Sequence, residues 1–382
     1  MESDNKLFLL DAYALIYRAY YAFIKNPRIN SKGFNTSAIL GFVNTLEEVL
    51  KKENPTHIGV AFDPAGPTFR HEAFEQYKAQ REETPEAIRL SVPIIKDIIR
   101  AYRIPILEVA GYEADDVIGT LATEAGRQGI TTYMMTPDKD YGQLVSDKVF
   151  MYRPKHTGGF EVMGVEEVKA KFDIQSPAQV IDMLGLMGDS SDNIPGCPGV
   201  GEKTAQKLIS EFGSIENLLE HTDQLKGALK TKVETNREMI TFSKFLATIK
   251  IDVPIQLEMD SLVREEADED SLRSIFEELE FRTLIDRVLK KEVSGNGITS
   301  TPKSKVATGK SAPSPLPLFP EEGGGIQGDL FANFTPNEPN EAKKSNLETL
   351  ESQPRNYQLI DTEYKRAEII QKLLTSEILS ID

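Results

Sequence analysis

Three short apolar runs in this chain each end on an aspartate, and this feature constrains the fold more than any other. The runs are KLFLLD, HIGVAFD and GITTYMMTPD, which end at Asp11, Asp63 and Asp138. Short runs rich in Val, Ile, Leu and Phe, each followed by an amphipathic segment, are typical of strands in a parallel sheet. Ligands of such sheets bind beyond the carboxyl ends of the strands. We therefore predict an α/β fold with three aspartates at one edge of its sheet.

Two longer segments have the pattern of helices that cover such a sheet. SAILGFVNTLEEVLKKE, residues 37–53, precedes the run that ends at Asp63, and EADDVIGTLATEAGRQG, residues 113–129, precedes the run that ends at Asp138. Alternating strands and helices indicate a central, mostly parallel sheet flanked by helices. This alternation extends from residue 6 to about residue 290.

The composition is that of a soluble globular protein. Hydrophobic residues make up 40% of the 382 residues and charged residues 27%, which is ordinary for one large domain with a tail or for two domains. No apolar stretch approaches the ~20 residues of a membrane span, and MESDNKLFLL lacks the basic start of a secretory signal. The single Cys197 excludes an internal disulfide, and the four histidines lack zinc-ligand spacing. We expect a cytoplasmic protein with no membrane partner.

Three acidic clusters add to the strand-end aspartates: EADD at 113–116, DKD at 138–140, and MGDSSDNIPG at 187–196. Each cluster alone has an ordinary explanation, since acids stabilise helix N-termini and aspartates favour turns and helix caps. Their accumulation favours a metal site. The nine carboxylates assigned to this site are Asp11, Asp63, Glu113, Asp115, Asp116, Asp138, Asp140, Asp189 and Asp192.

Such a supply of carboxylates fits two Mg²⁺ or Mn²⁺ ions, because both ions take hard oxygen ligands. Two ions ~3.5–4 Å apart have the geometry for in-line displacement at phosphorus. No group of the chain itself is expected to neutralise the cluster, so bound divalent cations would have to do so. The nine carboxylates account for nine of the 16 surplus negative charges and leave −7. The acidic total therefore does not exclude DNA as a partner, although DNA-binding domains are usually basic.

A basic segment, PTFRHEAFEQYKAQREETPEAI, follows the Asp63 run. Arg70, Lys78 and Arg81 lie at spacings of eight and three, so they can project from one side of a helix. From composition alone, the interleaved glutamates favour a solvated amphipathic face. The position directly after a metal-ligand strand makes a catalytic role for the three cations a competing interpretation, and Tyr77 offers a ring on which a nucleobase could stack.

The segment IPGCPGVGEKTAQKLISEFGSIENLL has the pattern of a helix-hairpin-helix. Gly199 and Gly201 let the backbone approach a phosphate, and the helix that follows points its first N–H groups at the anion. The spacing is not that of a P-loop. A hairpin of this kind grips the duplex backbone without reading bases. The DNA-binding residues predicted here are Gly199, Gly201, Lys203, Thr204 and Lys207.

Taken together, these motifs resemble the 5′-nuclease domains of bacterial DNA polymerase I, within the flap-endonuclease family. The resemblance covers about residues 6–290 and rests on FLLDAYALIYRAYYA, VAFDPAGPTFRHE, YKAQR, GYEADDVIGTLA, TPDKDYGQL, MGDSSDNIPG and PGVGEKTA. It implies a resolvase-like or PIN-like core with a helical arch at about 68–100. It also implies a two-metal hydrolase that trims 5′ strands at flaps, nicks or RNA primer ends during DNA replication and repair.

The resemblance further assigns roles to residues. Lys78 and Arg81 are similar to arch residues that contact the scissile phosphate, and a monovalent cation is expected at the hairpin. The tighter metal site would take Asp11, Asp63, Glu113, Asp115 and Asp116, and the second would take Asp138, Asp140, Asp189 and Asp192.

We expect a nuclease core at 1–180, a helix-hairpin-helix subdomain at 181–290 and a linker at 291–355. The linker is rich in Ser, Thr, Pro, Gly and Lys and has too few large apolar residues to fold. Family members continue past it, so residues 356–382 resemble the start of a truncated proofreading-exonuclease-like domain that ends here at Asp382. A covalently linked polymerase module is then an expected partner, and the chain is otherwise expected to be monomeric.

Two alternatives remain open at this point. A PIN-like ribonuclease shares the logic of carboxylates at strand ends, but such domains need fewer residues and carry no helix-hairpin-helix. A DNA-structure binding module with vestigial acids is the second alternative, against which the complete set of nine carboxylates argues.

Overall fold

The computed structural model describes residues 5–155 and 158–289. The chain divides into two units, residues 1–333 and 334–382, and all described residues belong to the first. The linker predicted for 291–355 and the domain start predicted for 356–382 lie outside the described residues. Within the described ranges, no helix has both the length and the apolar character needed to cross a bilayer.

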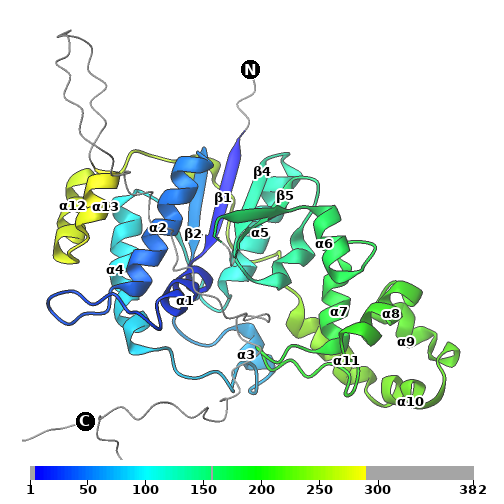
Figure 1. Cartoon of the computed structure of the whole chain (residues 1–382). Coiled ribbons are helices and arrows are strands. Elements are labelled where there is room, and N and C mark those ends of the chain that lie inside the picture. Colours follow the sequence, from blue (N-terminus) through cyan, green and yellow to red (C-terminus); the bar gives the residue numbers. More distant parts are fainter. Residues whose placement is uncertain (1–4, 156–157, 290–382) are drawn as a thin grey trace, which may run out of the picture. The chain divides into compact units, whose positions relative to one another are not determined.

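A six-stranded sheet with the order β3-β2-β1-β4-β5-β6 forms the centre of this unit (Figure 1). All neighbouring strands are parallel except β5 and β6, which are antiparallel. The prediction of a mostly parallel sheet is confirmed, and the three apolar runs become β1, β2 and β4. The strands are β1 (Lys6–Asp11), β2 (His57–Ala61), β3 (Ile106–Leu107), β4 (Thr131–Met135), β5 (Val149–Pro154) and β6 (Phe160–Met163).

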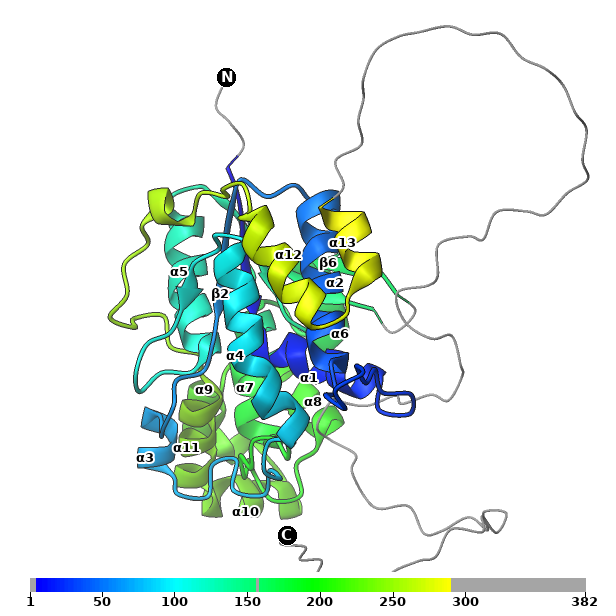
Figure 2. The same cartoon turned by 90° about the vertical axis from the view of Figure 1, so that its left-hand side faces the viewer.

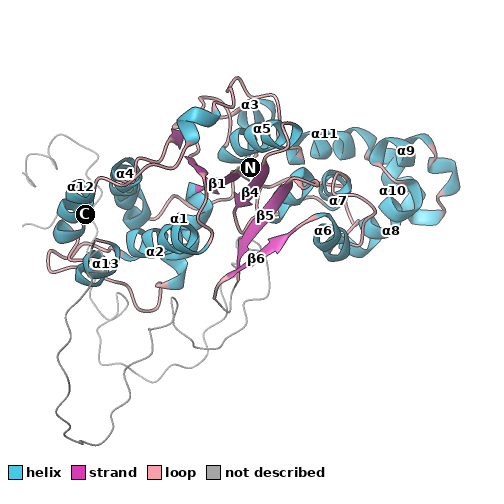
Figure 3. Cartoon of the chain, turned by 90° about the horizontal axis from the view of Figure 1, so that it is seen from above, coloured by secondary structure: helices cyan, strands magenta, loops and turns pink. Residues whose placement is uncertain are grey.

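Alternate residues of β1 feed two separate cores, because successive side chains of a strand point to opposite faces. Phe8 and Leu10 pack with α1 (Ala12–Ala22), α2 (Ser37–Lys52), α4 (Glu86–Ala101), α12 (Glu269–Glu278) and α13 (Arg282–Val288). Leu7 and Leu9 pack with α5 (Ala114–Arg127) on the other face. Figures 2 and 3 show this layering. The helices predicted at 37–53 and 113–129 are confirmed as α2 and α5.

A helical subdomain follows the sheet and shares the core of α5. Its helices α7 and α11 pack closely against each other, and a loop joins α7 to α8 at the predicted hairpin. The helices are α6 (Val165–Phe172), α7 (Gln179–Met187), α8 (Glu202–Phe212), α9 (Ile215–Glu220), α10 (Gly227–Thr235) and α11 (Arg237–Ala247). The segment after α11 returns along α5 to the far end of the sheet.

The prediction that one helix carries Arg70, Lys78 and Arg81 is wrong. In this segment only α3 (Phe69–Ala73) is helical; residues 75–80 form turns, and residues 81–85 have no regular structure before α4 begins. Lys78 has a φ of 56°, outside the helical region. Tertiary contacts replace the helical hydrogen bonds here, since the Lys78 amide donates to the carbonyl of Asp192. The predicted arch therefore consists of α3, a turn-rich segment and α4, whose Ile95 and Ile98 are buried in the core.

Candidate metal centre

Asp11 is the last residue of β1 and also caps α1, so the sheet and the helix both define its position. Its Oδ1 accepts the amide of Ala14 at 3.1 Å. Its Oδ2 accepts the hydroxyls of Thr136 at 3.2 Å and Tyr141 at 3.1 Å. Burial, together with the nearby charge of Asp63, raises the pKa of the Asp11 carboxyl to about 7. The fold therefore holds this carboxylate where ionisation is unfavourable.

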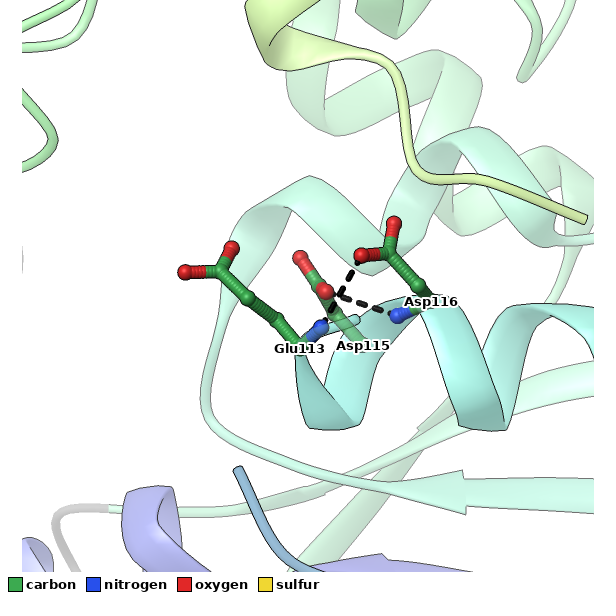
Figure 4. A group of neighbouring side chains, drawn as sticks. All are labelled: Glu113, Asp115 and Asp116. Carbon is green, nitrogen blue, oxygen red and sulfur yellow. Dashed lines mark hydrogen bonds between the residues drawn. The ribbon is translucent and has the colours of Figure 1, made fainter. Parts of the chain in front are cut away.

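The N-cap and the first turn of α5 supply three more carboxylates (Figure 4). Glu113, Asp115 and Asp116 each offer an oxygen, and these oxygens lie within 4.8 Å of one another. Asp63 joins them, because its Oδ1 accepts the amide of Ala114 at 2.8 Å. Burial and the neighbouring Asp116 raise the pKa of Asp115 well above its ordinary value.

Arg70 lies beneath this cluster with a side chain that is only 1% exposed. Its guanidinium donates to Glu113 Oε2 at 3.0 Å and to both oxygens of Asp116 at 2.8 Å. Its remaining N–H groups donate to the carbonyls of Leu246 and Thr248, each at 2.9 Å. All five N–H groups are therefore used inside the protein. Arg70 was predicted as a catalytic residue, but the protein covers its side chain, so it cannot contact a substrate directly in this geometry.

Tyr77 and Lys78 lie between the α5 carboxylates and the loop that carries Asp192. The Tyr77 hydroxyl is 3.0 Å from Glu113 Oε2 and 3.0 Å from Asp192 Oδ2. The Lys78 ammonium is 2.7 Å from Glu113 Oε1 and 3.8 Å from Asp192 Oδ2. The Tyr77 ring is 97% buried, with Lys78 above it at 4.8 Å. The prediction that a nucleobase stacks on Tyr77 is therefore wrong in this geometry.

Arg81 extends the same group of basic side chains toward Asp192. It donates to Asp192 Oδ1 at 2.5 Å and to the Ser191 carbonyl at 3.1 Å. Burial opposes the ionisation of Asp192, but Lys78 and Arg81 outweigh it and lower the pKa of that carboxyl. Burial likewise opposes ionisation of Glu113, and Lys78 again lowers its pKa overall. These two acids are therefore held as carboxylates.

Asp189 lies in the loop between α7 and α8, where the backbone at Gly188 and the backbone at Gly196 are in close contact. Gly188 and Gly196 have φ of 73° and 62°, and a Cβ on Gly196 would lie 2.3 Å from the Gly188 amide nitrogen. Only glycine fits this approach. Asp189 accepts the amide and hydroxyl of Ser191, and its Oδ2 is 3.0 Å from the Lys139 ammonium.

The segment after β4 brings Asp138 and Asp140 to the same edge. Asp138 Oδ1 accepts the amide of Asp140 at 3.0 Å. Burial, with the charges of Asp138 and Asp189, raises the pKa of Asp140 well above its ordinary value. Asp140 Oδ1 is buried and has no hydrogen-bond partner among the described residues. A buried carboxylate oxygen in this situation normally requires a cation or a proton.

Four basic side chains, rather than divalent cations alone, offset the acidic cluster. Arg70, Lys78, Arg81 and Lys139 each form a salt bridge with one or more of the nine carboxylates. The expectation that nothing in the sequence could neutralise the site is therefore wrong. Nine formal negative charges still exceed four positive ones by five. With the unpartnered oxygen of Asp140, this surplus fits divalent cations, which take hard oxygen ligands.

The five hairpin residues predicted to bind DNA lie apart from the carboxylates, on the hairpin and the start of α8. Gly199 has a φ of 76°, and Gly201 caps α8 with open space where a Cβ would be. Lys203 and Lys207 are exposed one helical turn apart, and Thr204 is half-buried. The geometry suits the approach of a phosphate backbone to the helix N-terminus.

Three residues near these groups were not predicted from the sequence. Lys139 and Tyr141 contact carboxylates, and their position within TPDKDYGQL is the signal that could have identified them. Lys232 of α10 donates to the carbonyl of Gly199 at 3.4 Å. Nothing in the sequence around Lys232 indicates that it lies near the hairpin.

Comparisons with known families match most of the described chain. The family model described as 5′-3′ exonuclease, N-terminal resolvase-like domain, matches residues 6–173. The model described as 5′-3′ exonuclease, C-terminal SAM fold, matches residues 175–270. The two matches meet close to the boundary between the sheet and the helical subdomain. They favour the nuclease interpretation over a PIN-like ribonuclease.

Curated relatives show similarity over the same region. DNA polymerase I of Bacillus caldotenax is 42% identical over 287 residues, which cover 74% of this chain and 32% of that protein. DNA polymerase I of Bacillus subtilis is 43% identical over 291 residues, which cover 75% of this chain and 33% of that protein. The chain thus spans about a third of the length of these relatives.

A solved structure has the same fold. The flap endonuclease of bacteriophage T5, in a complex with DNA and metal ions, aligns with a TM-score of 0.52 and 22% sequence identity. The alignment covers 72% of this chain and 99% of that one. At this level of identity the likeness establishes the architecture of sheet and helical subdomain.

Proposed function

Because the chain belongs to the 5′-3′ exonuclease family, we propose that it is a divalent-cation-dependent 5′ nuclease that hydrolyses DNA phosphodiesters. The observation that carries the proposal is the acidic surplus at the carboxyl edge of the sheet, which lies beside the Lys78 ammonium. Preferred substrates would be 5′ flaps, nicks and RNA primer ends. The bacteriophage T5 flap endonuclease, which shares the fold, has been solved with DNA and metal ions.

Two divalent cations, Mg²⁺ or Mn²⁺, would be held at this edge. The carboxylates of Asp11, Asp63, Glu113 and Asp115 would serve one ion, and those of Asp138, Asp140, Asp189 and Asp192 would serve the other. When bound, such ions lower the pKa of water and stabilise the charge on phosphoryl oxygens. Products would be a 5′-phosphorylated fragment and a 3′-hydroxyl end.

Lys78 is the basic side chain best placed to act on the substrate. Its ammonium lies near one carboxylate from each of the two proposed ligand sets, at 2.7 Å from Glu113 and 3.8 Å from Asp192. Those two acids raise its pKa well above the ordinary value despite its burial, so it stays protonated at neutral pH. A fixed positive charge here would stabilise negative charge that develops on the phosphate. Arg81 would bind the same phosphate group.

The hairpin around Gly199 and Gly201 would hold the duplex part of the substrate, with Lys203 and Lys207 on backbone phosphates and a monovalent cation at the hairpin. In a longer protein of the DNA polymerase I kind, the chain would be the 5′ nuclease part beside a polymerase module. It would then remove primers and trim damaged strands during replication and repair.

The test uses a duplex with a 5′ flap, labelled separately at each end of the flapped strand. We expect cleavage near the junction in Mg²⁺, none in EDTA, and none with Asp115→Asn. A duplex with a 3′ flap and a single-stranded RNA serve as substrate controls. Equal cleavage of the RNA, or cleavage of the flap in EDTA, would refute the proposal.

A further inference from the structure

Asp116 differs from the other carboxylates of the centre in that hydrogen bonds saturate it. Its side chain is 0% exposed, whereas that of Asp115 is 25% exposed. Oδ1 accepts from Arg70 at 2.8 Å and from the Lys250 amide at 2.8 Å. Oδ2 accepts from Arg70 at 2.8 Å and from the Glu113 amide at 3.1 Å. Since a carboxylate oxygen has two lone pairs, all four acceptor positions of Asp116 are used.

A metal ion could bind Asp116 only by displacing one of these donors. Two of them belong to a bidentate guanidinium–carboxylate pair, the strongest common arrangement of charge-assisted hydrogen bonds. The other two are backbone amides, which would be left unpaired in a buried place. Asp115 offers ions an easier alternative, because its side chain is 25% exposed and its Oδ1 accepts the Asp116 amide, the bond drawn as a dashed line in Figure 4.

Arg70 connects this pair to the helical subdomain. Two of its N–H groups donate to the carbonyls of Leu246, in the last turn of α11, and Thr248, just after that helix. Lys250, two residues further on, donates its amide to Asp116. The start of α5 is therefore tied through one buried ion pair to the backbone that leaves α11. This backbone continues directly from the part of the chain that carries the hairpin.

We propose that Asp116 and Arg70 are a positioning pair of the metal centre, and that Asp116 is not a metal ligand. The pair holds Glu113 and the first turn of α5 so that Glu113 and Asp115 face the bound ions. Arg70 contributes through Glu113 and Asp116 without touching the substrate. This inference rests on the proposed function, and it replaces the sequence-based assignments of Asp116 as a ligand and Arg70 as a catalytic group.

The inference can be tested without measuring cleavage. The DNA-free protein is titrated with Mn²⁺, and binding is measured by calorimetry and electron paramagnetic resonance. Asp115→Asn should lose one of the ions that the wild type binds. Asp116→Asn should keep the number of bound ions and weaken their affinity about tenfold, as loss of a supporting group does. Arg70→Lys keeps the charge but loses the bidentate geometry, so it should behave like Asp116→Asn and provides a second variant if the first fails to fold.

Asp182→Asn is the matched control. Asp182 is also a buried carboxylate that accepts a backbone amide, from Ile215, and forms a salt bridge with Lys244 at 2.6 Å. It belongs to the helical subdomain, so its variant should lower the melting temperature and leave Mn²⁺ affinity unchanged. Metal affinity therefore separates positioning from a general loss of stability.

Two results would overturn the inference while leaving the proposed function intact. Loss of the same ion in Asp116→Asn as in Asp115→Asn would make Asp116 a ligand. Wild-type Mn²⁺ affinity in both Asp116→Asn and Arg70→Lys, with lowered melting temperatures as in the control, would make the pair merely structural. A wild-type protein that binds no Mn²⁺ would refute the proposed function itself, and the inference with it.

Discussion

Asp11→Asn should make the cation-free protein more stable, although it removes a predicted metal ligand. The carboxyl has a pKa of about 7 instead of 3.8 because it is buried and lies near Asp63. The amide of asparagine can accept from Ala14 as the carboxylate does, and asparagine caps helices as well as aspartate. The amide NH₂ would replace Oδ2, so the hydroxyls of Thr136 and Tyr141 would have to rotate and accept instead of donating. The substitution removes the unfavourable charge and keeps the cap of α1.

The size of the effect follows from linkage. A carboxyl whose pKa is raised on folding binds its proton more tightly in the folded state, so stability falls as pH rises from about 4 to about 7. One pKa unit is worth about 1.4 kcal/mol, so the raised pKa of Asp11 costs the fold about 4 kcal/mol at pH 8, where the buried carboxyl is ionised. At pH 5 the cost is about 2 kcal/mol, because the carboxyl must take up a proton on folding. Asn at position 11 carries neither cost. For a domain of this size the gain at pH 8 is about 7 °C in melting temperature.

Thermal and urea unfolding in EDTA at pH 5 and pH 8 would measure the difference. We expect the Asp11→Asn variant to have a higher melting temperature and a higher urea midpoint than the wild type at both pH values, with the larger difference at pH 8. Added Mg²⁺ should narrow the gap, because ions that bind only the folded wild type stabilise it. Asp182→Asn, which breaks a buried ion pair, should be less stable than the wild type at both pH values. A variant no more stable than the wild type at pH 8, or a gap that does not widen from pH 5 to pH 8, would refute the reasoning.

Four other substitutions probe the remaining parts of the site. Lys78→Ala should slow single-turnover cleavage about 10²-fold or more with little change in DNA affinity, and an effect on affinity alone would contradict its catalytic role. Lys203→Ala and Lys207→Ala should each weaken duplex binding and lower the salt slope by about one, so an unchanged salt titration would argue against backbone contacts. Gly196→Ala should destabilise the fold by about 1 kcal/mol or more, because its Cβ would meet the Gly188 backbone at 2.3 Å; an unchanged urea midpoint would show that the loop can relax.

The sheet and its acidic edge were predictable because they depend on local patterns. Continuous apolar runs specify buried strands, and β1, β2 and β4 form where those runs lie. An aspartate that directly follows a parallel strand lies at the carboxyl edge of the sheet, whichever strands are its neighbours. Amphipathic periodicity specified α2 and α5 in the same way. The sequence therefore located the candidate site at one edge of the sheet and named a set of candidate carboxylates for it.

The environments of Arg70, Tyr77 and Asp116 depend on partners remote in sequence. Helical spacing suggested that Arg70 and Lys78 share a face, yet Arg70 is buried against a carbonyl 176 residues away and Tyr77 against a carboxylate 115 residues away. Local sequence determines which segments become strands and helices, because hydrophobic periodicity and capping act over a few residues. Only the tertiary structure decides which charged groups are desolvated and paired, because that depends on which distant backbone and side chains reach them.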